Sequence, residues 1–254
     1  MRRFGTCLVL LACLWAGPIV QADVEYDLLL QEFEQAQQQW VQQLREAEVS
    51  EQPPHPAKDF LPRFRRYAEE HAGRSEAIPA LGWIVGAAGQ ISDGPGKPGA
   101  DVTWALERLA KDHAADPAIK DVLRGFRYSA YDVGSEPLIA LYERIIKANS
   151  DKQARAAASF NLAFTLFRSW GASAEDAEAR AVENKRAEKL FRKIVQEYPD
   201  TEAAKRAGGY VFEIEHLQIG MKAPEIVGSD ADGKEIRLSQ FRGQVVVLDF
   251  WGFW

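Results

Sequence analysis

The 254-residue chain has only two cysteines, and both of them, Cys7 and Cys13, lie near its amino terminus. Once that terminus is removed, the remainder has no thiol, so it can hold neither a disulfide nor a thiolate-bound metal. The chain also lacks a basic stripe, and its net charge is −6. Phosphate contacts need clustered Lys and Arg, so we expect no nucleic-acid partner.

Long hydrophobic runs are missing too. Residues 7–16 form the main apolar run, which is too short to span a bilayer. Arg2 and Arg3 precede it, Gly17-Pro18 ends it, and Val20-Gln21-Ala22 places small residues at cleavage positions. This pattern predicts a secretory signal peptide over residues 1–22, removed after Ala22.

An alternative is lipoprotein processing at Cys13, because Leu10-Leu11-Ala12-Cys13 loosely resembles a lipobox. Either route predicts an exported protein of the periplasm or cell envelope. Cleavage near Ala22 would release it in soluble form, whereas lipidation of Cys13 would anchor it.

Residues 23–217 are predicted to form a domain of paired helices. The first helix is indicated by apolar residues at spacings of three or four, which share one helical face: Tyr26, Leu29, Phe33, Ala36, Trp40, Leu44 and Ala47. Pro53-Pro54-His55-Pro56 then ends this helix and forms a stiff link.

Beyond the prolines a helix–turn–helix pattern recurs. A helix ends on Tyr or His, a short turn follows, and Ser75 or Thr201 is predicted to cap the next helix with Glu just inside. Weaker copies precede Asp116 and Asp151. A repeat of about 40 residues built this way is typical of stacked helical hairpins.

The last copy carries Ala187, Phe191, Tyr198 and Pro199 and resembles the second helix of a tetratricopeptide repeat. The helix near residues 161–167 lacks the Trp and Gly usual in that family, so the prediction is a TPR-like layer. Such a layer is either a face that binds a peptide partner or a rigid spacer, and the sequence leaves both open.

Four histidines are the remaining candidate metal ligands, and their spacing does not combine them. His55 lies among prolines, His71 and His113 lie at predicted helix ends, and His216 lies at a junction. We therefore predict no metal site and no cofactor.

From Ile219 the apolar period changes from 3.6 to 2. Residues 225–229 and 235–238 are predicted strands, joined by a turn over residues 230–234 and followed by a helical turn at 239–243. Residues 245–251 are apolar except for Asp249, which is typical of a strand buried on both faces.

Such a strand needs neighbouring strands and covering helices, and residues 219–254 could form only a hairpin and one strand. Exposed Val, Phe and Trp side chains would favour aggregation. We therefore expect residues 218–254 to be the opening of an incomplete α/β domain, with the chain cut inside it.

Four motifs in this region resemble the TlpA-like thioredoxin-fold thiol–disulfide oxidoreductases. They are Gly220-Met-Lys-Ala-Pro224, Asp232-Gly-Lys234, Leu238-Ser-Gln-Phe-Arg-Gly243 and Val246-Val-Leu-Asp-Phe-Trp-Gly-Phe-Trp254. In that family a Cys-x-x-Cys redox pair comes next. Peroxiredoxins share the hairpin, but they place Pro soon after the strand aromatic, and Trp251-Gly-Phe-Trp254 has none.

The resemblance implies that one thiolate attacks a substrate disulfide and a second cysteine resolves the mixed disulfide. Asp249 is the candidate proton relay to the resolving thiol, although many TlpA-like members have Asn there. Trp251 would pack beneath the site and Trp254 would flank the first cysteine. The redox cysteines are absent from this sequence, which alone is expected to be inactive.

Three function classes follow. The first is an exported thiol–disulfide oxidoreductase, with protein dithiols or disulfides as substrates and a thiol reductant as partner. The second is a non-enzymatic TPR-like binding or scaffold protein that keeps a redoxin remnant. The third is a peroxiredoxin-type peroxide reductase.

Overall fold

The fold is described from a computed structural model that covers residues 24–46, 52–92, 94–168 and 177–252. The predicted signal peptide, both cysteines and Trp254 lie outside these residues. Among the helices that are described, none is long and apolar enough to cross a membrane.

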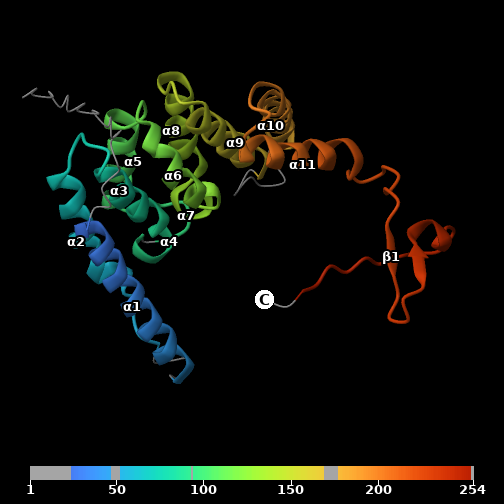
Figure 1. Ribbon diagram of the computed structural model, residues 1–254, viewed down its shortest axis with the longest axis horizontal. Coiled ribbons are helices and arrows are strands. Elements are labelled where there is room, and N and C mark those ends of the chain that lie inside the picture. The colour runs from blue at the N-terminus through green and yellow to red at the C-terminus, as the bar shows by residue number, and fades with distance from the viewer. Residues whose placement is uncertain (1–23, 47–51, 93, 169–176, 253–254) are drawn as a thin grey trace, which may run out of the picture.

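The described residues are mostly helical, with one small sheet (Figure 1). The α-helices are α1 (Val24–Glu46), α2 (Ala57–Glu70), α3 (Ala77–Gly86), α4 (Ala88–Ile91), α5 (Ala100–Asp112), α6 (Lys120–Leu123), α7 (Ala130–Val133), α8 (Ser135–Ala148), α9 (Lys152–Arg168), α10 (Ala177–Glu197) and α11 (Glu202–His216). The 3₁₀ helices are η2 (Pro117–Ile119), η3 (Arg124–Arg127) and η5 (Leu238–Phe241), and the strands are β1 (Val227–Ser229) and β2 (Glu235–Arg237).

The first helix, α1, matches the predicted apolar stripe. Its buried residues are Leu29 and Phe33, and it packs on α2. Residues 52–55 are not helical, and α2 begins at Ala57, directly after Pro56. The indole nitrogen of Trp40 donates to the carbonyl oxygen of Pro53 at 2.9 Å, so this link folds back on α1.

Two helices flank each of the four predicted junctions: α2 and α3, α5 and α6, α8 and α9, and α10 and α11. The first, third and fourth of these pairs pack as helical hairpins, whereas α6 packs on α3 and α9. Successive pairs contact one another through α3 on α5 and α6, α5 on α8, α6 on α9, and α9 on α10 and α11. We call α2–α11 the helical layer, and Figure 1 shows it running from α2 to α11 as one continuous body. Three of the four hairpins are therefore observed, whereas a tetratricopeptide arrangement is not established by them.

Side-chain caps start the second helix at three of the four junctions. The hydroxyl oxygen of Thr201 accepts from the amide of Ala204 at 3.1 Å, as predicted. Asp151 accepts from Ala154 N at 2.8 Å, and Asp116 accepts from Ala118 N at 2.9 Å. Each cap satisfies one of the free amides at a helix start.

The prediction that Ser75 caps a helix is wrong. Helix α3 begins at Ala77 without a side-chain cap, and the Ser75 hydroxyl donates instead to the carboxylate of Asp116 in the next junction. The turn before α3 already satisfies the first amides through its backbone, because Ala77 N donates to Arg74 O at 3.0 Å. The hydroxyl is thus available to link two hairpins.

That link belongs to a series of polar contacts between successive junctions, which we call the junction seam. The side-chain amide of Asn149 donates to the carbonyl oxygens of Ala114 at 3.0 Å and Asp116 at 2.9 Å. Lys152 and Asp200 then form an ion pair at 3.8 Å. Each junction is therefore tied to the next at the same edge of the layer.

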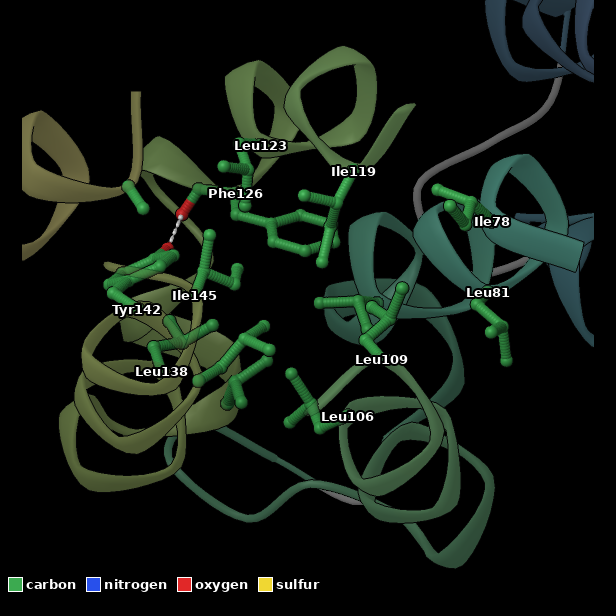
Figure 2. Close-up of a cluster of buried hydrophobic side chains, with 14 of the residues drawn as sticks. Ile78, Leu81, Leu106, Leu109, Ile119, Leu123, Phe126, Leu138, Tyr142 and Ile145 are labelled. Atoms are coloured by element: carbon green, nitrogen blue, oxygen red, sulfur yellow. Dashed lines mark hydrogen bonds between the residues drawn. The ribbon is translucent and has the colours of Figure 1, made fainter. Parts of the chain in front are cut away.

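The core of the layer is continuous and apolar (Figure 2). Side chains from α3, α5, η2, α6, η3 and α8 meet in it, and the Tyr142 hydroxyl donates to Phe126 O at 3.4 Å. Burial strongly raises the pKa of Tyr142, because the phenolate would have to give up its hydration. Helix α9 lies deepest, with every residue from Ala158 to Leu166 buried.

Helices α3 and α6 approach closely at Gly82. A Cβ atom at Gly82 would lie 2.4 Å from Val122 Cγ1, well inside van der Waals contact. Only glycine fits this contact without a shift of the helices.

The predicted hairpin after residue 219 is present. Strands β1 and β2 pair antiparallel with Val227 opposite Arg237 and Ser229 opposite Glu235. Asp230 holds the turn by accepting from Lys234 N at 2.8 Å, and Gly233 has φ +80°, a conformation that favours glycine. The predicted helical turn is η5.

Residues 245–251 do not form the predicted buried strand. They join no ladder in the part of the chain that is described, and Val245, Val247 and Phe250 are 98%, 88% and 82% exposed. A strand forms through hydrogen bonds to a neighbour, and the only described sheet is the β1–β2 pair. Residues 245–251 are apolar as the sequence indicates, but their side chains are not buried.

Candidate functional site

The best-defined part of the C-terminal segment (residues 217–252) is a small hydrogen-bonded unit around the hairpin. Leu238 N donates to Ile226 O at 2.9 Å and extends the pairing of β1 and β2. The carboxylate of Glu225 accepts from Ser239 N at 2.9 Å, which joins the start of the hairpin to η5. These bonds to Ser239, with the nearby cations Arg237 and Arg242, lower the pKa of Glu225.

A hollow of about 690 Å³ lies between this unit and the end of α11. Phe212 and His216 line it from the helix, with their ring centroids 4.7 Å apart. Leu238 and Phe241 line it from η5. Lys222, Glu225 and Arg242 add charge to its rim. Its walls are largely exposed, so it is an open groove.

The two candidate site residues that the structure describes, Asp249 and Trp251, do not line a formed site. Asp249 lies on the extended part of the C-terminal segment and is exposed, with no hydrogen bond or ion pair to the residues that the structure describes. Trp251 is 73% exposed, and Trp254 lies outside the described residues. A proton relay needs a buried carboxylate next to a thiol, so the role of Asp249 stays a prediction.

The histidines lie where the sequence indicated. His71 and His113 end α2 and α5, and His216 is the last residue of α11. His55 lies between the rings of Trp40 at 4.6 Å and Phe33 at 6.4 Å, where burial lowers its pKa. Within the described ranges, no group of three or more His, Cys, Asp or Glu side chains could hold a metal ion.

A second hollow was not anticipated from the sequence. It has a volume of about 210 Å³, and cationic side chains from η3, α6 and α11 line it. The spacing of Lys120, Arg124 and Arg127 by four and three residues puts them on one helical face, which is the signal that could have indicated it. Arg206 could not be added from sequence alone, because it is distant in the chain.

Comparison with curated proteins gives one short, consistent similarity. A stretch of 46 residues is 46% identical to thiol–disulfide oxidoreductase ResA of Bacillus thuringiensis subsp. konkukian and of Bacillus cereus, covering 18% of this chain and 27% of each relative. ResA of Geobacillus thermodenitrificans is 50% identical over 38 residues, which are 15% of this chain and 22% of that protein. No family model and no solved structure matches the chain.

The chain thus spans about a quarter of the length of these relatives. The similarity supports a redoxin-like segment and a redox-related function, in agreement with the resemblance seen in the motifs. It covers at most 18% of the chain, so most of the helical layer lies outside it.

Proposed function

We propose that this protein takes part in thiol–disulfide exchange with exported protein substrates, and that residues 218–254 are the opening of its thioredoxin-like domain. In this proposal the hairpin and η5 form the first part of that domain. Residues 23–217 are a separate helical, TPR-like domain that positions it, and residues 1–22 are the export signal.

The observation that carries the proposal is the agreement between the short similarity to ResA and the four ordered motifs from Gly220 to Trp254. The observed hairpin adds support, because its Asp-Gly-Lys turn and the following η5 occur at the motif positions. Thiol–disulfide exchange would require two thiols, and residues 23–254 contain none. A thiol reductant and disulfide-bonded proteins are the proposed partners.

The test is the intact mass and thiol count of the native protein, isolated from the envelope fraction of its source organism. We expect a product well above 28.4 kDa with two cysteines that become alkylated only after reduction. A native product near the mass of residues 23–254 with no thiol would overturn the redox proposal. If the thiols are present, Asp249→Asn is expected to slow resolution of the mixed disulfide, because the proton relay is lost.

A second candidate, a binding scaffold without catalysis, is favoured by one feature of the helical layer. A groove of about 610 Å³ lies between α5 and α8, with Leu106, Ala140 and Leu141 among its apolar residues and charged residues beside them. Such a groove suits a peptide. Specific enrichment of a partner by the full chain, lost on Ala140→Glu at the exposed wall of the groove, would support this function, and no enrichment over a control helical protein would exclude it.

A further inference from the structure

The unanticipated hollow, which we call the cationic cleft, gathers positive charge in an otherwise acidic protein. Lys120, Arg124 and Arg127 line it from α6 and η3, and Arg206 lines it from α11. The chain as a whole has a net charge of −6, so the cleft differs in sign of charge from the protein as a whole. The elements that supply the charges are held together by α9, which contacts α6, η3 and α11.

Few of these charges are neutralised within the described residues. The one carboxylate that lines the cleft, Glu202, already accepts from Arg206 Nε at 3.0 Å. Lys120 donates to the carbonyl oxygen of Pro117 at 3.2 Å, and neither Arg124 nor Arg127 forms an ion pair with a described carboxylate. Like charges held close together repel, and an anion between them would remove that cost.

Arg127 is held in place for such a role. Its guanidinium lies over the ring of Phe160, 5.3 Å from the ring centroid. Its Nε atom is buried and has no hydrogen-bond partner among the residues described. A buried donor without a partner is costly, and an anion in the cleft beside this guanidinium would offset part of that cost through its charge.

The rest of the cleft suits a small ligand. Its other walls include Leu123, Ala157 and Ala203, and the amide side chain of Gln153. A volume of about 210 Å³ compares with about 30 Å³ for one water molecule in the liquid. There is room for a carboxylate or phosphate group with a few attached carbon atoms.

We propose that the cationic cleft binds an anionic ligand through carboxylate or phosphate oxygens, with Arg124 and Arg127 as the main donors. Guanidinium groups make paired, charge-assisted hydrogen bonds to both kinds of oxyanion. The site goes beyond thiol–disulfide exchange and uses none of its residues, so it stands or falls separately from the proposed function.

The test is isothermal titration calorimetry of the full chain at low ionic strength, with inorganic phosphate in one arm and hexaglutamate in the other. We expect saturable binding of at least one probe. Arg124→Gln and Arg127→Gln should each weaken it about tenfold or more, since a hydrogen bond to a charged group is lost. The matched control is Arg45→Gln, an exposed arginine of α1, which should leave the affinity within twofold.

Binding of phosphate alone identifies a phosphate ligand, and binding of hexaglutamate alone identifies carboxylates. The absence of heat with both probes would overturn the proposal, as would equal weakening by Arg45→Gln. Circular dichroism checks the fold of each variant. If Arg127→Gln unfolds because its packing on Phe160 is lost, the exposed Arg124 decides the outcome.

Discussion

The helical layer and the C-terminal segment differ in how their apolar residues are used. In the layer, large side chains such as Phe64, Phe126 and Phe191 are almost completely buried. In residues 217–252 no side chain is buried, although the sequence is about as apolar there. The layer obtains its burial from neighbouring hairpins, whereas the segment has only two short strands and a 3₁₀ turn.

This difference shows which interactions can form locally. Turns, caps and a two-stranded hairpin need only residues close in the chain, and both regions have them. Burial of large side chains needs several elements packed together, as in the contacts of α9 with α6, α8, α10 and α11. An isolated hairpin is at best marginally stable, so we expect the layer to carry the folding free energy of the described residues.

Substituting one phenylalanine in each region should give the largest contrast. Phe191 is fully buried and stacks on Tyr210 with ring centroids 4.8 Å apart. Phe191→Ala is expected to lower the free energy of unfolding by about 3–5 kcal/mol, because it removes apolar contacts and leaves a cavity. Phe250→Ala, at an exposed site, should change it by less than about 0.5 kcal/mol. Urea unfolding followed by circular dichroism measures both, and equal losses would contradict the contrast.

A smaller effect is expected at the close approach of α3 and α6. Gly82→Ala should destabilise the protein by about 1–3 kcal/mol, because the added methyl group overlaps Val122. The control is Gly86→Ala at the end of the same helix, where no atom lies within 4 Å of the new Cβ. Better helix propensity should make that change neutral or slightly stabilising.

Urea unfolding followed by circular dichroism measures the Gly82 and Gly86 effects, and a double variant tests the cause of the Gly82 effect. Adding Val122→Ala to Gly82→Ala creates the space that the methyl group needs. The double variant should then lose less stability than the sum of the two single changes. Additive losses would show that the contact with Val122 is not the reason.

The junction seam is tested by Asp116→Ala. This change removes the cap on Ala118 and the link to Ser75, and a loss of about 1–2 kcal/mol is expected from the cap and the hydrogen bond together. Asp200→Ala, at an exposed junction residue with a 3.8 Å ion pair, should cost little. A double-mutant cycle of Asp116→Ala with Ser75→Ala measures the coupling energy of their hydrogen bond. A coupling energy of zero would show that this bond does not stabilise the junction seam.

The smallest predicted effect is a dependence of stability on pH. His113 is buried, and burial lowers its pKa although Asp116 and Asp112 act in the opposite direction. The unfolded chain therefore binds the proton more tightly, so stability is full above about pH 6.5 and falls as the pH drops below it. The slope from this histidine cannot exceed about 1.4 kcal/mol per pH unit.

Urea unfolding between pH 7.5 and 5 measures that slope. His113→Gln should reduce it, leaving the contribution of His55, whose pKa is also lowered by burial. An unchanged slope in His113→Gln would show that its protonation does not oppose folding.

The elements that depend on nearby residues were predictable from the sequence. Periodicity indicated α1, the prolines marked its end, Thr201 marked the start of α11, and the Asp-Gly-Lys turn indicated the hairpin. Ser75 was misassigned because its partner, Asp116, lies in another junction. The sequence around one turn cannot show that a hydroxyl in it forms its hydrogen bond with a residue of another junction.

The candidate site was less predictable for the same reason. The motif around Asp249 indicated a buried strand, but burial depends on elements that the pattern itself does not contain. Conversely, the cationic cleft combines Arg124 and Arg127 with Arg206, which only the packing of η3, α9 and α11 brings together. Chemistry that depends on residues distant in the sequence has to be read from the fold.

The burial of α9 limits how this protein can change over evolutionary time. Inserting one residue in the middle of this helix would turn all later side chains by about 100° around its axis. Leu162 would then point where the neighbouring helices have room for Ala163, and Phe164 where they have room for Thr165. The connection between α4 and α5 lies at the surface, where changes of length are tolerated better than in a buried helix. Sequences descended from a common ancestor are therefore expected to differ at α9 by substitutions of similar size, and at this loop by insertions and deletions.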